Sequence, residues 1–274
     1  MTEFEIYFDQ HFGNRWDGLY QALKLPADRK WTNLFSESPE WINSEQGSES
    51  DADREKTAGW YKMDRASAAP VHALSLEKGQ RVLDLCAGPG GKAMMILNQI
   101  GKEGTLVANE FSSARRVRMQ EIFRKLVPEE FKKNLHVSGS DGIRVGMMRS
   151  GEFDRVLADV PCSSERHLIE QDELGKWTKH RSQFIAKKQY ALLCSAGLAL
   201  RPGGIVVYST CSISPFENDD VIRRFLKKKS PDGEYEVLLD QESGLETERT
   251  EFGQQILPDR TQTGPMYFAV LKKK

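Results

Sequence analysis

Hydrophobic and polar residues follow a strand, loop and helix rhythm from Arg81 onward. Short aliphatic runs predict strands, and the segments between them carry apolar residues at helical spacing, such as Met119, Ile122, Phe123 and Leu126. Strands that alternate with helices form a mostly parallel sheet with helices on both faces. We therefore predict a doubly wound, seven-stranded, Rossmann-like α/β fold, with strands at 81–85, 105–109, 135–137, 153–158, 205–209, 235–239 and 266–271.

The residues before this alternating region have a different pattern. Phe12, Trp16, Leu19 and Leu23 lie at helical spacing and predict an amphipathic helix. Residues 36–56 are polar and acidic, which predicts a flexible linker or a long surface loop, and 63–76 again has a helical pattern. We expect two parts: an N-terminal aromatic helical segment with an acidic linker at 1–59, and one α/β domain at 60–274.

The composition argues against several classes of protein. No apolar run approaches the roughly 20 residues of a membrane span, and the acidic start resembles neither a secretory signal nor a transit peptide. Four cysteines in 274 residues, with no CxxC pair and no His/Cys cluster, argue against a disulfide framework and against a metal site. We expect free thiols in a reducing compartment.

A glycine-rich loop, Cys86-Ala87-Gly88-Pro89-Gly90-Gly91, joins the first predicted strand to a helix that begins near Lys92. Glycines let the backbone approach a ligand, and a helix N-terminus favours an anionic group. Glu110 ends the next strand, where an acid commonly binds ribose hydroxyls, and Asp141-Gly142 follows the third strand. The spacing is not GxGxxG, and Pro89 within the loop and Asp84 before it fit S-adenosylmethionine better than NAD. Lys92 could pair with the methionine carboxylate. The alternative is a tight turn without a ligand.

Two cysteines each follow an aliphatic run that predicts the end of a strand. Cys162 comes after residues 156–161, and Cys211 comes after 205–210. Ligands bind parallel sheets at this edge, and two thiols there suit methylation of a pyrimidine at C5. One thiolate adds to C6 and activates C5, and a base later removes the C5 proton so that the thiol can leave. Asp159 would hold the base at N3 and N4. The alternative is that both cysteines fill the sheet edge as small hydrophobic residues.

Three segments, DLCAGPGGK, DVPCSSERH and STCS, resemble the Sun-domain (Fmu/NSUN) RNA cytosine-5 methyltransferases. The similarity runs from about Trp60 to the C-terminus and includes 63–67 and 264–268, while FEIYFDQHFGNRW near the start resembles the organellar branch. The resemblance implies the seven-stranded methyltransferase fold. It also implies that Cys211 is the nucleophile, that Cys162 assists proton removal or product release, and that Asp159 contacts the base.

The same resemblance implies S-adenosyl-L-methionine as the cofactor, with no metal ion. It places a set of loop and strand-end residues around that cofactor: Cys86, Ala87, Gly88, Pro89, Gly90, Gly91, Lys92, Glu110, Arg115, Asp141, Gly142 and Asp159. The family usually has Ala where this chain has Gly88, and often Thr where it has Ala93. Neither difference removes a catalytic group.

The substrate implied by the resemblance is RNA, whose target base must leave its stack to meet a thiolate. The basic stretch 166–188, which includes Arg166 and Trp177, would contact the RNA beside Cys162. The net charge of −1 argues against strong RNA affinity of the chain alone. We therefore expect a helical-repeat RNA-binding partner of the mitochondrial terminator-factor type, or the ribosomal small subunit, to supply part of the affinity.

DVPCSSERH followed by Leu168 is more similar to the mitochondrial small-subunit rRNA enzymes than to the tRNA enzymes. The resemblance thus implies a mitochondrial enzyme that methylates rRNA. A mitochondrial tRNA cytosine-5 methyltransferase and a non-catalytic ribosome assembly factor with the same fold stay open as alternatives. An NAD-dependent dehydrogenase is a third, and it would bind a dinucleotide without methyl transfer.

Overall fold

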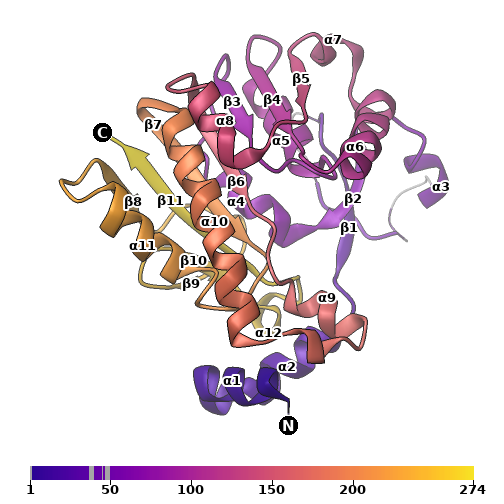
Figure 1. Cartoon of the computed structure of the whole chain (residues 1–274). Helices are drawn as coiled ribbons and strands as arrows, with labels where there is room; N and C mark the ends of the chain where they lie inside the picture. Colours follow the sequence, from indigo (N-terminus) through magenta and orange to yellow (C-terminus); the bar gives the residue numbers. More distant parts are fainter. Residues whose placement is uncertain (1, 37–39, 45, 47–49) are drawn as a thin grey trace.

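A mixed sheet forms the centre of the structure, a computed structural model that describes all residues except 1, 37–39, 45 and 47–49 (Figure 1). Its nine strands in the described chain are β3 (Arg81–Asp84), β4 (Thr105–Asn109), β5 (Leu135–Ser138), β6 (Phe153–Asp159), β7 (Leu200–Thr210), β8 (Tyr235–Leu238), β9 (Glu248–Arg249), β10 (Gln254–Ile256) and β11 (Met266–Lys273). Their order is β5-β4-β3-β6-β7-β11-β10-β9, and β8 also pairs with β11. The first five strands of this order are parallel, and β11 is antiparallel to β7.

The predicted α/β fold is confirmed, and each of the predicted strands has a counterpart in the sheet. Within this sheet, the strands that sequence reasoning did not predict are β9 and β10, which extend the antiparallel side. They have two and three residues. Runs this short carry no hydrophobic period that a sequence pattern could reveal.

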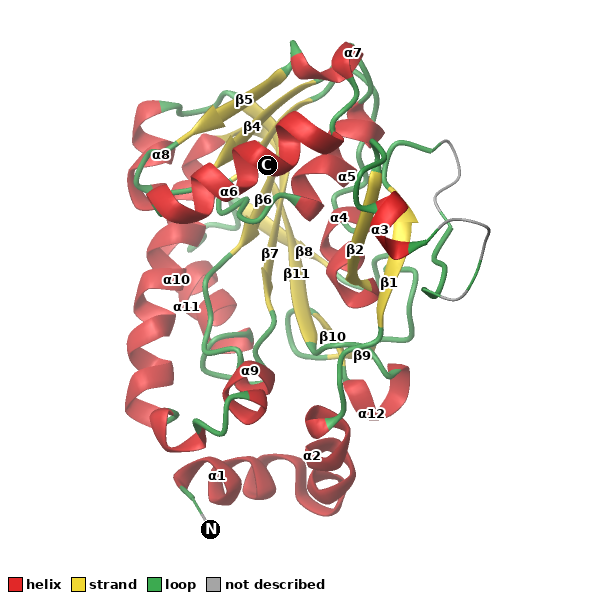
Figure 2. Cartoon of the chain, turned by 90° about the vertical axis from the view of Figure 1, so that its right-hand side faces the viewer, coloured by secondary structure: helices red, strands yellow, loops and turns green. Residues whose placement is uncertain are grey.

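Helices cover both faces of the sheet, as a doubly wound fold requires (Figure 2). Successive strand residues point to opposite faces, so Val82 packs in one hydrophobic cluster and Leu83 in the other. The first cluster includes residues of α4 (Ala69–His72), α5 (Gly91–Ile100) and α6 (Ser113–Leu126), and the second includes residues of α8 (Gly142–Met148), α10 (Lys179–Ala199) and α11 (Asp219–Lys229). The carboxyl ends of the parallel strands therefore open between two helical layers, where ligands bind such sheets.

Shorter helices lie in the loops, at η2 (Arg65–Ala68), α7 (Glu129–Lys132), α9 (Glu165–Glu170), η3 (Leu174–Lys176) and α12 (Pro258–Thr261). Within the described ranges, no helix is long and apolar enough to cross a membrane. In the same ranges, no three His, Cys, Asp or Glu side chains are grouped so that they could hold a metal ion.

The N-terminal segment packs beside α9 and α12 (Figure 1). It consists of α1 (Glu3–Phe12), η1 (Gly13–Arg15) and α2 (Trp16–Lys24), so the predicted amphipathic helix is found but begins after Phe12. A capping box starts α1, because Thr2 Oγ1 accepts a hydrogen bond from Glu5 N at 3.2 Å and Thr2 N donates to the Glu5 carboxylate at 2.7 Å. Apolar side chains of α1 and α2, among them Phe4 and Trp16, form one cluster with Trp177.

A two-stranded sheet joins this segment to the domain. β1 (Arg29–Asn33) pairs antiparallel with β2 (Trp60–Asp64). The helix predicted at 63–76 is therefore wrong at its start, because strand pairing outweighs the local helical pattern. Of the linker predicted at 36–56, residues 37–39, 45 and 47–49 lie outside the described residues; the rest contains α3 (Asp51–Arg54) and a backbone bridge between Ile42 and Trp31. The division at residue 59 stays a prediction.

Candidate active site

Three adjoining cavities form a cleft at the carboxyl edge of the sheet. The loop cavity, of about 330 Å³, lies over the glycine loop. The outer cavity, of about 250 Å³, lies between α9 and Gly264-Pro265-Met266. Ser67 borders all three. The thiol cavity, also about 250 Å³, is lined by Ser67, Cys86, Gly88, Lys92, Arg115, Asp159, Val160, Pro161, Cys162, Ser164, Cys211 and Met266.

The two cysteines singled out in the sequence face each other in the thiol cavity. Asp159 of β6 and Ser209 of β7 are register partners in adjacent parallel strands, so the chain leaves both strands side by side. The Sγ atoms of Cys162 and Cys211 are 3.1 Å apart. The Oγ atom of Ser164 lies 3.3 Å from the first sulfur and 3.1 Å from the second. Ser164 has a φ of +51°, which is uncommon for a residue other than glycine and is found at functional loops.

The contact between the thiols separates their pKa values. The hydrogen bond with Cys162 lowers the pKa of Cys211, burial opposes this effect, and the Ser164 hydroxyl adds to it. The same sulfur–sulfur hydrogen bond, together with burial, raises the pKa of Cys162. Only the thiolate form of cysteine is strongly nucleophilic. The geometry therefore favours Cys211 as the thiolate and Cys162 as its hydrogen-bond donor.

Asp159 and Lys92 form an ion pair where the loop cavity meets the thiol cavity. The Asp159 Oδ2 atom lies 2.9 Å from Lys92 Nζ, and Oδ1 accepts a hydrogen bond from Ser209 Oγ at 2.9 Å. Burial disfavours the charge of Lys92, but Asp159 outweighs it, and the pKa of Lys92 is raised. Both residues line both cavities, so they can contact ligands in either one.

The glycine loop forms one wall of the loop cavity through Cys86, Ala87, Gly88, Pro89 and Gly91. Gly90 instead turns the chain into α5 with a φ of +114°, and a Cβ atom there would lie 2.8 Å from the Phe123 ring. Glycine suits this conformation and this close approach. Burial and the Asp84 carboxylate raise the pKa of Cys86. Cys86 is therefore a neutral wall residue and not a second nucleophile.

Asp84, at the end of β3, indicates that the loop cavity accepts a cationic ligand. It is 1% exposed, and neither of its carboxylate oxygens has a hydrogen-bond partner. Burial, and then the nearby Asp159, raise the pKa of Asp84 to about 8. A buried carboxylate without a partner is unfavourable, so a positive group in the cavity would stabilise its charged form. S-adenosylmethionine carries an ammonium and a sulfonium group, and the side chains of this cavity fit it.

The other predicted cofactor residues differ in their placement. Glu110 is 1% exposed, and its Oε1 atom accepts hydrogen bonds from Ser112 N at 2.8 Å and from Arg115 at 3.1 Å, while Oε2 has no partner. A Cβ atom at Gly88 would lie 2.5 Å from that Oε2, so the glycine leaves room for the carboxylate beside the loop. Asp141 caps α8 through Ile143 N at 3.1 Å. Glu110, Asp141 and the buried Gly142 are not among the described residues that line the three cavities, and their role stays a prediction.

Sequence reasoning did not assign several residues of the cleft to the site. Ser67 and Met266 border the thiol cavity, and Asp64 borders the loop and outer cavities. These residues belong to the segments 63–67 and 264–268, whose resemblance to the family was visible but carried no assigned role. Asp84 was noted before the glycine loop as a feature that fits S-adenosylmethionine, but it was not included among the site residues. For Ser164, no sequence pattern signals a hydroxyl between two sulfur atoms.

Most of the basic side chains of the stretch 166–188 are exposed, but two of the residues expected to contact RNA are buried. Arg166 is 8% exposed and donates a hydrogen bond to Thr263 O at 3.0 Å. Trp177 is 2% exposed and packs in the N-terminal aromatic cluster. The expectation was therefore wrong for these two side chains, because the N-terminal helices and the segment before β11 cover them. The other basic residues of the stretch are exposed, and their contact with RNA stays a prediction: His167, Lys176, Lys179, His180, Arg181, Lys187 and Lys188.

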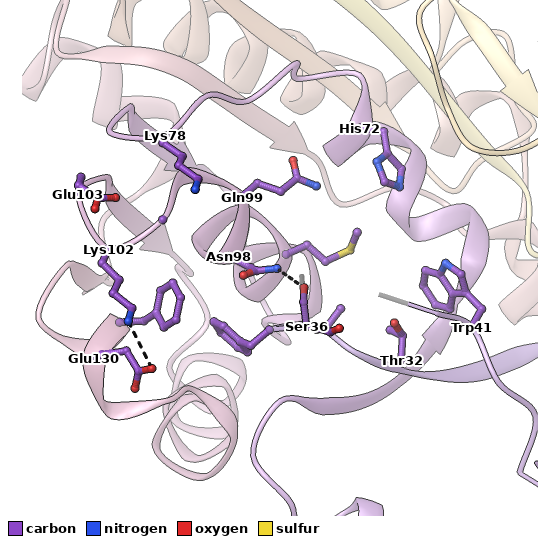
Figure 3. Close-up of a pocket in the computed structure, with 15 residues that line it drawn as sticks. Thr32, Ser36, Trp41, His72, Lys78, Asn98, Gln99, Lys102, Glu103 and Glu130 are labelled. Carbon is purple, nitrogen blue, oxygen red and sulfur yellow. Dashed lines mark hydrogen bonds and ion pairs between the residues drawn. The ribbon is translucent and has the colours of Figure 1, made fainter. Parts of the chain in front are cut away.

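A larger cavity, of about 880 Å³, lies elsewhere, at the end of α5 that is far from the glycine loop (Figure 3). Its wall includes the aromatic side chains of Phe35, Trp41 and Phe131. Figure 3 shows Lys102 paired with Glu130, at 3.7 Å. None of the four cysteines lines this cavity. The cleft that holds the thiols is therefore the candidate active site.

Comparisons with known proteins connect this cleft to a family. A family model described as 16S rRNA methyltransferase RsmB/F matches residues 71–272. The chain is 38% identical over 230 residues to a mitochondrial tRNA (cytosine(34)-C(5))-methyltransferase of Danio rerio. The aligned region covers 78% of this chain and 62% of that relative. It is 34% identical over 229 residues to the 5-cytosine rRNA methyltransferase NSUN4 of Mus musculus, with 78% of this chain and 60% of the relative covered.

Among solved structures, a methyltransferase homologue from Pyrococcus horikoshii has the same fold, with a TM-score of 0.79 at 21% identity over 96% of this chain and 92% of that one. The chain spans about three fifths of the length of the curated relatives it matches. The segment matched by the family model contains the glycine loop, Asp159 and both cysteines of the thiol cavity. The chain therefore belongs to the RsmB/F family of S-adenosylmethionine-dependent RNA cytosine-5 methyltransferases.

Proposed function

We propose that this protein methylates C5 of a cytosine in the RNA of the mitochondrial small ribosomal subunit, with S-adenosylmethionine as methyl donor. One observation carries the reaction: the sulfur atoms of Cys162 and Cys211 lie 3.1 Å apart in a cavity that they share with the Asp159–Lys92 pair. A dehydrogenase or a passive assembly factor has no use for a thiol whose pKa is lowered at the ligand edge of the sheet.

The loop cavity would hold the cofactor. Asp84 would face a positive group of the ligand, and Glu110 would accept hydrogen bonds from ribose hydroxyls through its unpartnered oxygen. The glycine loop lets the backbone approach the ligand closely. S-adenosylmethionine, when bound, supplies the electrophilic methyl group that C5 takes up. Lys92 keeps Asp159 oriented toward the thiol cavity.

The thiol cavity would hold the cytosine. The Cys211 thiolate forms a bond to C6, and the electron pair of the C5–C6 double bond makes C5 nucleophilic. Asp159 binds the N3 and N4 edge and stabilises this adduct. After C5 carries the methyl group, a base in the cavity takes the C5 proton, the double bond forms again, and the C6–S bond breaks to return the Cys211 thiolate. Cys162 assists this last stage, since its thiol lies next to the departing sulfur.

The preference for rRNA rests on similarity. The matched family model is described as a 16S rRNA methyltransferase, and NSUN4 is described as an rRNA enzyme. Residues 159–168 resemble the small-subunit rRNA enzymes. The Danio rerio relative, which acts on cytosine 34 of tRNA by its description, favours mitochondrial tRNA as the second candidate. The Danio rerio relative is described as mitochondrial, which supports a mitochondrial location.

A substitution series tests the chemistry. Cys211→Ala should abolish methyl transfer, while Cys162→Ala should retain attack on C6 and accumulate a covalent RNA adduct. Denaturing gels with labelled RNA detect the adduct as a slowly migrating band. Methylation by Cys211→Ala at the wild-type rate would show that the nucleophile is assigned wrongly. Absence of the adduct in a folded Cys162→Ala protein would contradict the proposed role of Cys162.

Bisulfite sequencing tests the substrate. In cells that lack this protein, one cytosine of the mitochondrial small-subunit rRNA should lose its methyl group while mitochondrial tRNA keeps its own. Loss confined to tRNA would establish the second candidate instead.

We also propose that a helical-repeat partner or the ribosomal small subunit supplies part of the RNA affinity, because the net charge is only −1. The isolated chain should bind its RNA weakly, and a tight, salt-sensitive complex would contradict this proposal.

A further inference from the structure

Two glutamates, Glu165 and Glu217, are buried directly behind the thiol cavity. Both are 0% exposed. Neither lines a cavity of the cleft, so neither meets a ligand there. Acidic side chains are rarely buried unless the surrounding groups bind them. The groups that bind these two carboxylates include the residues that follow the two cysteines in the chain.

Glu217 holds the loop of Cys162. Its Oε2 atom accepts hydrogen bonds from the Ser163 backbone N–H at 2.9 Å and from Gln189 Nε2 at 2.9 Å. Its Oε1 atom accepts from the hydroxyls of Ser163 and Ser182, each at 2.6 Å. Gln189 Nε2 also donates to Pro161 O at 3.0 Å. The residues on both sides of Cys162 are thus bound by one carboxylate and one amide.

Glu165 holds the loop of Cys211. Its Oε1 atom accepts hydrogen bonds from Ser212 Oγ at 2.9 Å and from the indole Nε1 of Trp177 at 3.2 Å. Its Oε2 atom accepts from the Ile213 backbone N–H at 3.1 Å. The Ser163 hydroxyl also contacts Glu165, and it lies 3.3 Å from Ser212 Oγ. The two loops therefore share one hydrogen-bond network.

This network also reaches the N-terminal helix. Trp177, which donates to Glu165, is enclosed by rings of α1: the Phe4, Tyr7 and Phe8 centroids lie 5.7, 5.2 and 5.0 Å from its own. The donor to Glu165 is therefore fixed by packing. Burial, and then the neighbouring Glu217, raise the pKa of Glu165, because a second buried carboxylate disfavours its charge.

We propose that Glu165 and Glu217 are positioning residues that fix the loops after β6 and β7, so that the Cys162 thiol faces the Cys211 sulfur. Their effect on catalysis rests on the proposed function, but the approach of the two sulfurs is a property of the fold and can be measured without RNA. The two glutamates do not act alike, because the donors around them differ.

The donors around Glu165 leave no place for an amide. In Glu165→Gln, the new NH₂ group faces either the Ile213 N–H or the Trp177 N–H, and neither can accept a hydrogen bond. In Glu217→Gln, the NH₂ group can face the hydroxyls of Ser163 and Ser182, which can rotate to accept it. Glu165→Gln should therefore displace the Cys211 loop, whereas Glu217→Gln should be tolerated and Glu217→Ala should not.

Oxidation by diamide measures the approach of the sulfurs directly. Each thiol loses one hydrogen, a disulfide bond forms, and diamide is reduced by the two hydrogens. We expect the rate of the Cys162–Cys211 cross-link to fall at least tenfold in Glu165→Gln and in Glu217→Ala, and less than threefold in Glu217→Gln. Glu121→Gln, at an exposed position of α6, is the matched control and should oxidise at the wild-type rate. Mass spectrometry of the peptides identifies the cross-link.

The kinetics of methyl transfer then test whether the position of the Cys211 loop affects catalysis. In Glu165→Gln, kcat for methyl transfer should fall at least tenfold while KM for S-adenosylmethionine stays within twofold, because the loop cavity is unchanged. If Glu165→Gln does not fold, Ser212→Ala carries the same test, since it deletes one hydrogen bond to Glu165 and leaves the acid in place.

The outcomes separate this inference from the proposed function. An unchanged cross-linking rate in a folded Glu165→Gln or Ser212→Ala protein would overturn the positioning role, even if methylation were lost. A slower cross-link in these variants, together with a wild-type protein that methylates no RNA, would support the positioning role and contradict the proposed function.

Discussion

The hydroxyl of Ser164 lies 3.1 Å from the sulfur of Cys211. After the hydrogen bond with Cys162, this contact is the second interaction that lowers the pKa of Cys211. In Ser164→Ala the pKa of Cys211 should rise, so less thiolate is present near neutral pH. We expect kcat/KM to fall roughly tenfold at pH 7, because the free energy of one hydrogen bond to a charged group corresponds to about that factor. The fall should be smaller at pH 9. The pH profile should therefore move to higher pH. Ser113→Ala, at an exposed position of α6, is the control. A Ser164→Ala pH profile that matches the profile of this control would contradict the prediction.

Replacing Asp159 with Asn, at the border of the loop and thiol cavities, should slow methyl transfer while the fold persists. The amide keeps the shape of the carboxylate but leaves Lys92 without its anion. We expect methyl transfer to slow by about 10²- to 10³-fold, as for the loss of one group that stabilises charge in a transition state. Single-turnover rates with labelled S-adenosylmethionine measure the effect, and thermal unfolding shows whether the fold persists. A wild-type rate in a folded variant would remove Asp159 from the reaction.

Asp84 makes the stability of the chain depend on pH. Burial, and then Asp159, raise its pKa from 3.8 to about 8, so in this range the folded chain holds a proton that the unfolded chain releases. The free energy of unfolding contributed by this group therefore falls as the pH rises through that window. In Asp84→Asn, the unfolding temperature without ligand should fall less between about pH 6 and pH 8 than in the wild type.

The same variant should bind S-adenosylmethionine more weakly, by about tenfold or more, because one charge-assisted contact is lost. Calorimetry measures this affinity, and differential scanning fluorimetry measures the unfolding temperature. Equal affinity of the two proteins would show that Asp84 does not face the positive part of the cofactor.

Phe4 should contribute strongly to stability although it lies near the start of the chain. Its ring is 0% exposed and meets Trp177 edge-on, with centroids 5.7 Å apart and planes at 84°. Phe4→Ala should lower the free energy of unfolding by about 3–5 kcal/mol, as for other large core side chains. Urea denaturation measures this change, and Ile6→Ala, at a 44% exposed position of the same helix, is the control. Equal losses in the two variants would contradict the packing of α1.

The sequence predicts those parts of the fold that local periodicity specifies. Val82 and Leu83 alternate between the two helical layers, and Met119 and Phe123 lie on one buried helix face, as their spacing indicates. The approach of Cys162 and Cys211 was also predictable, because each follows a predicted strand at the ligand-binding edge of the sheet. The two strands, β6 and β7, are neighbours in the sheet.

Contacts between distant segments could not be predicted in this way. Phe4 packs on Trp177, and β1 pairs with β2 across the acidic segment. The burial of Glu165 was hidden as well, because an acid in a sequence indicates a surface position unless its donors are known. The hydroxyls and N–H groups that bind it come from Ser163, Trp177 and the chain after Cys211.

The packing of the α1 rings against Trp177, and the hydrogen bond from that indole to Glu165, make the first helix an unsuitable place for labels. An affinity tag, a fluorophore or an antibody that pulls α1 away would loosen the indole, and through it the support of the reactive sulfur. Attachments at Lys274 avoid this path, because the chain end lies at the opposite side of the molecule from α1 (Figure 1).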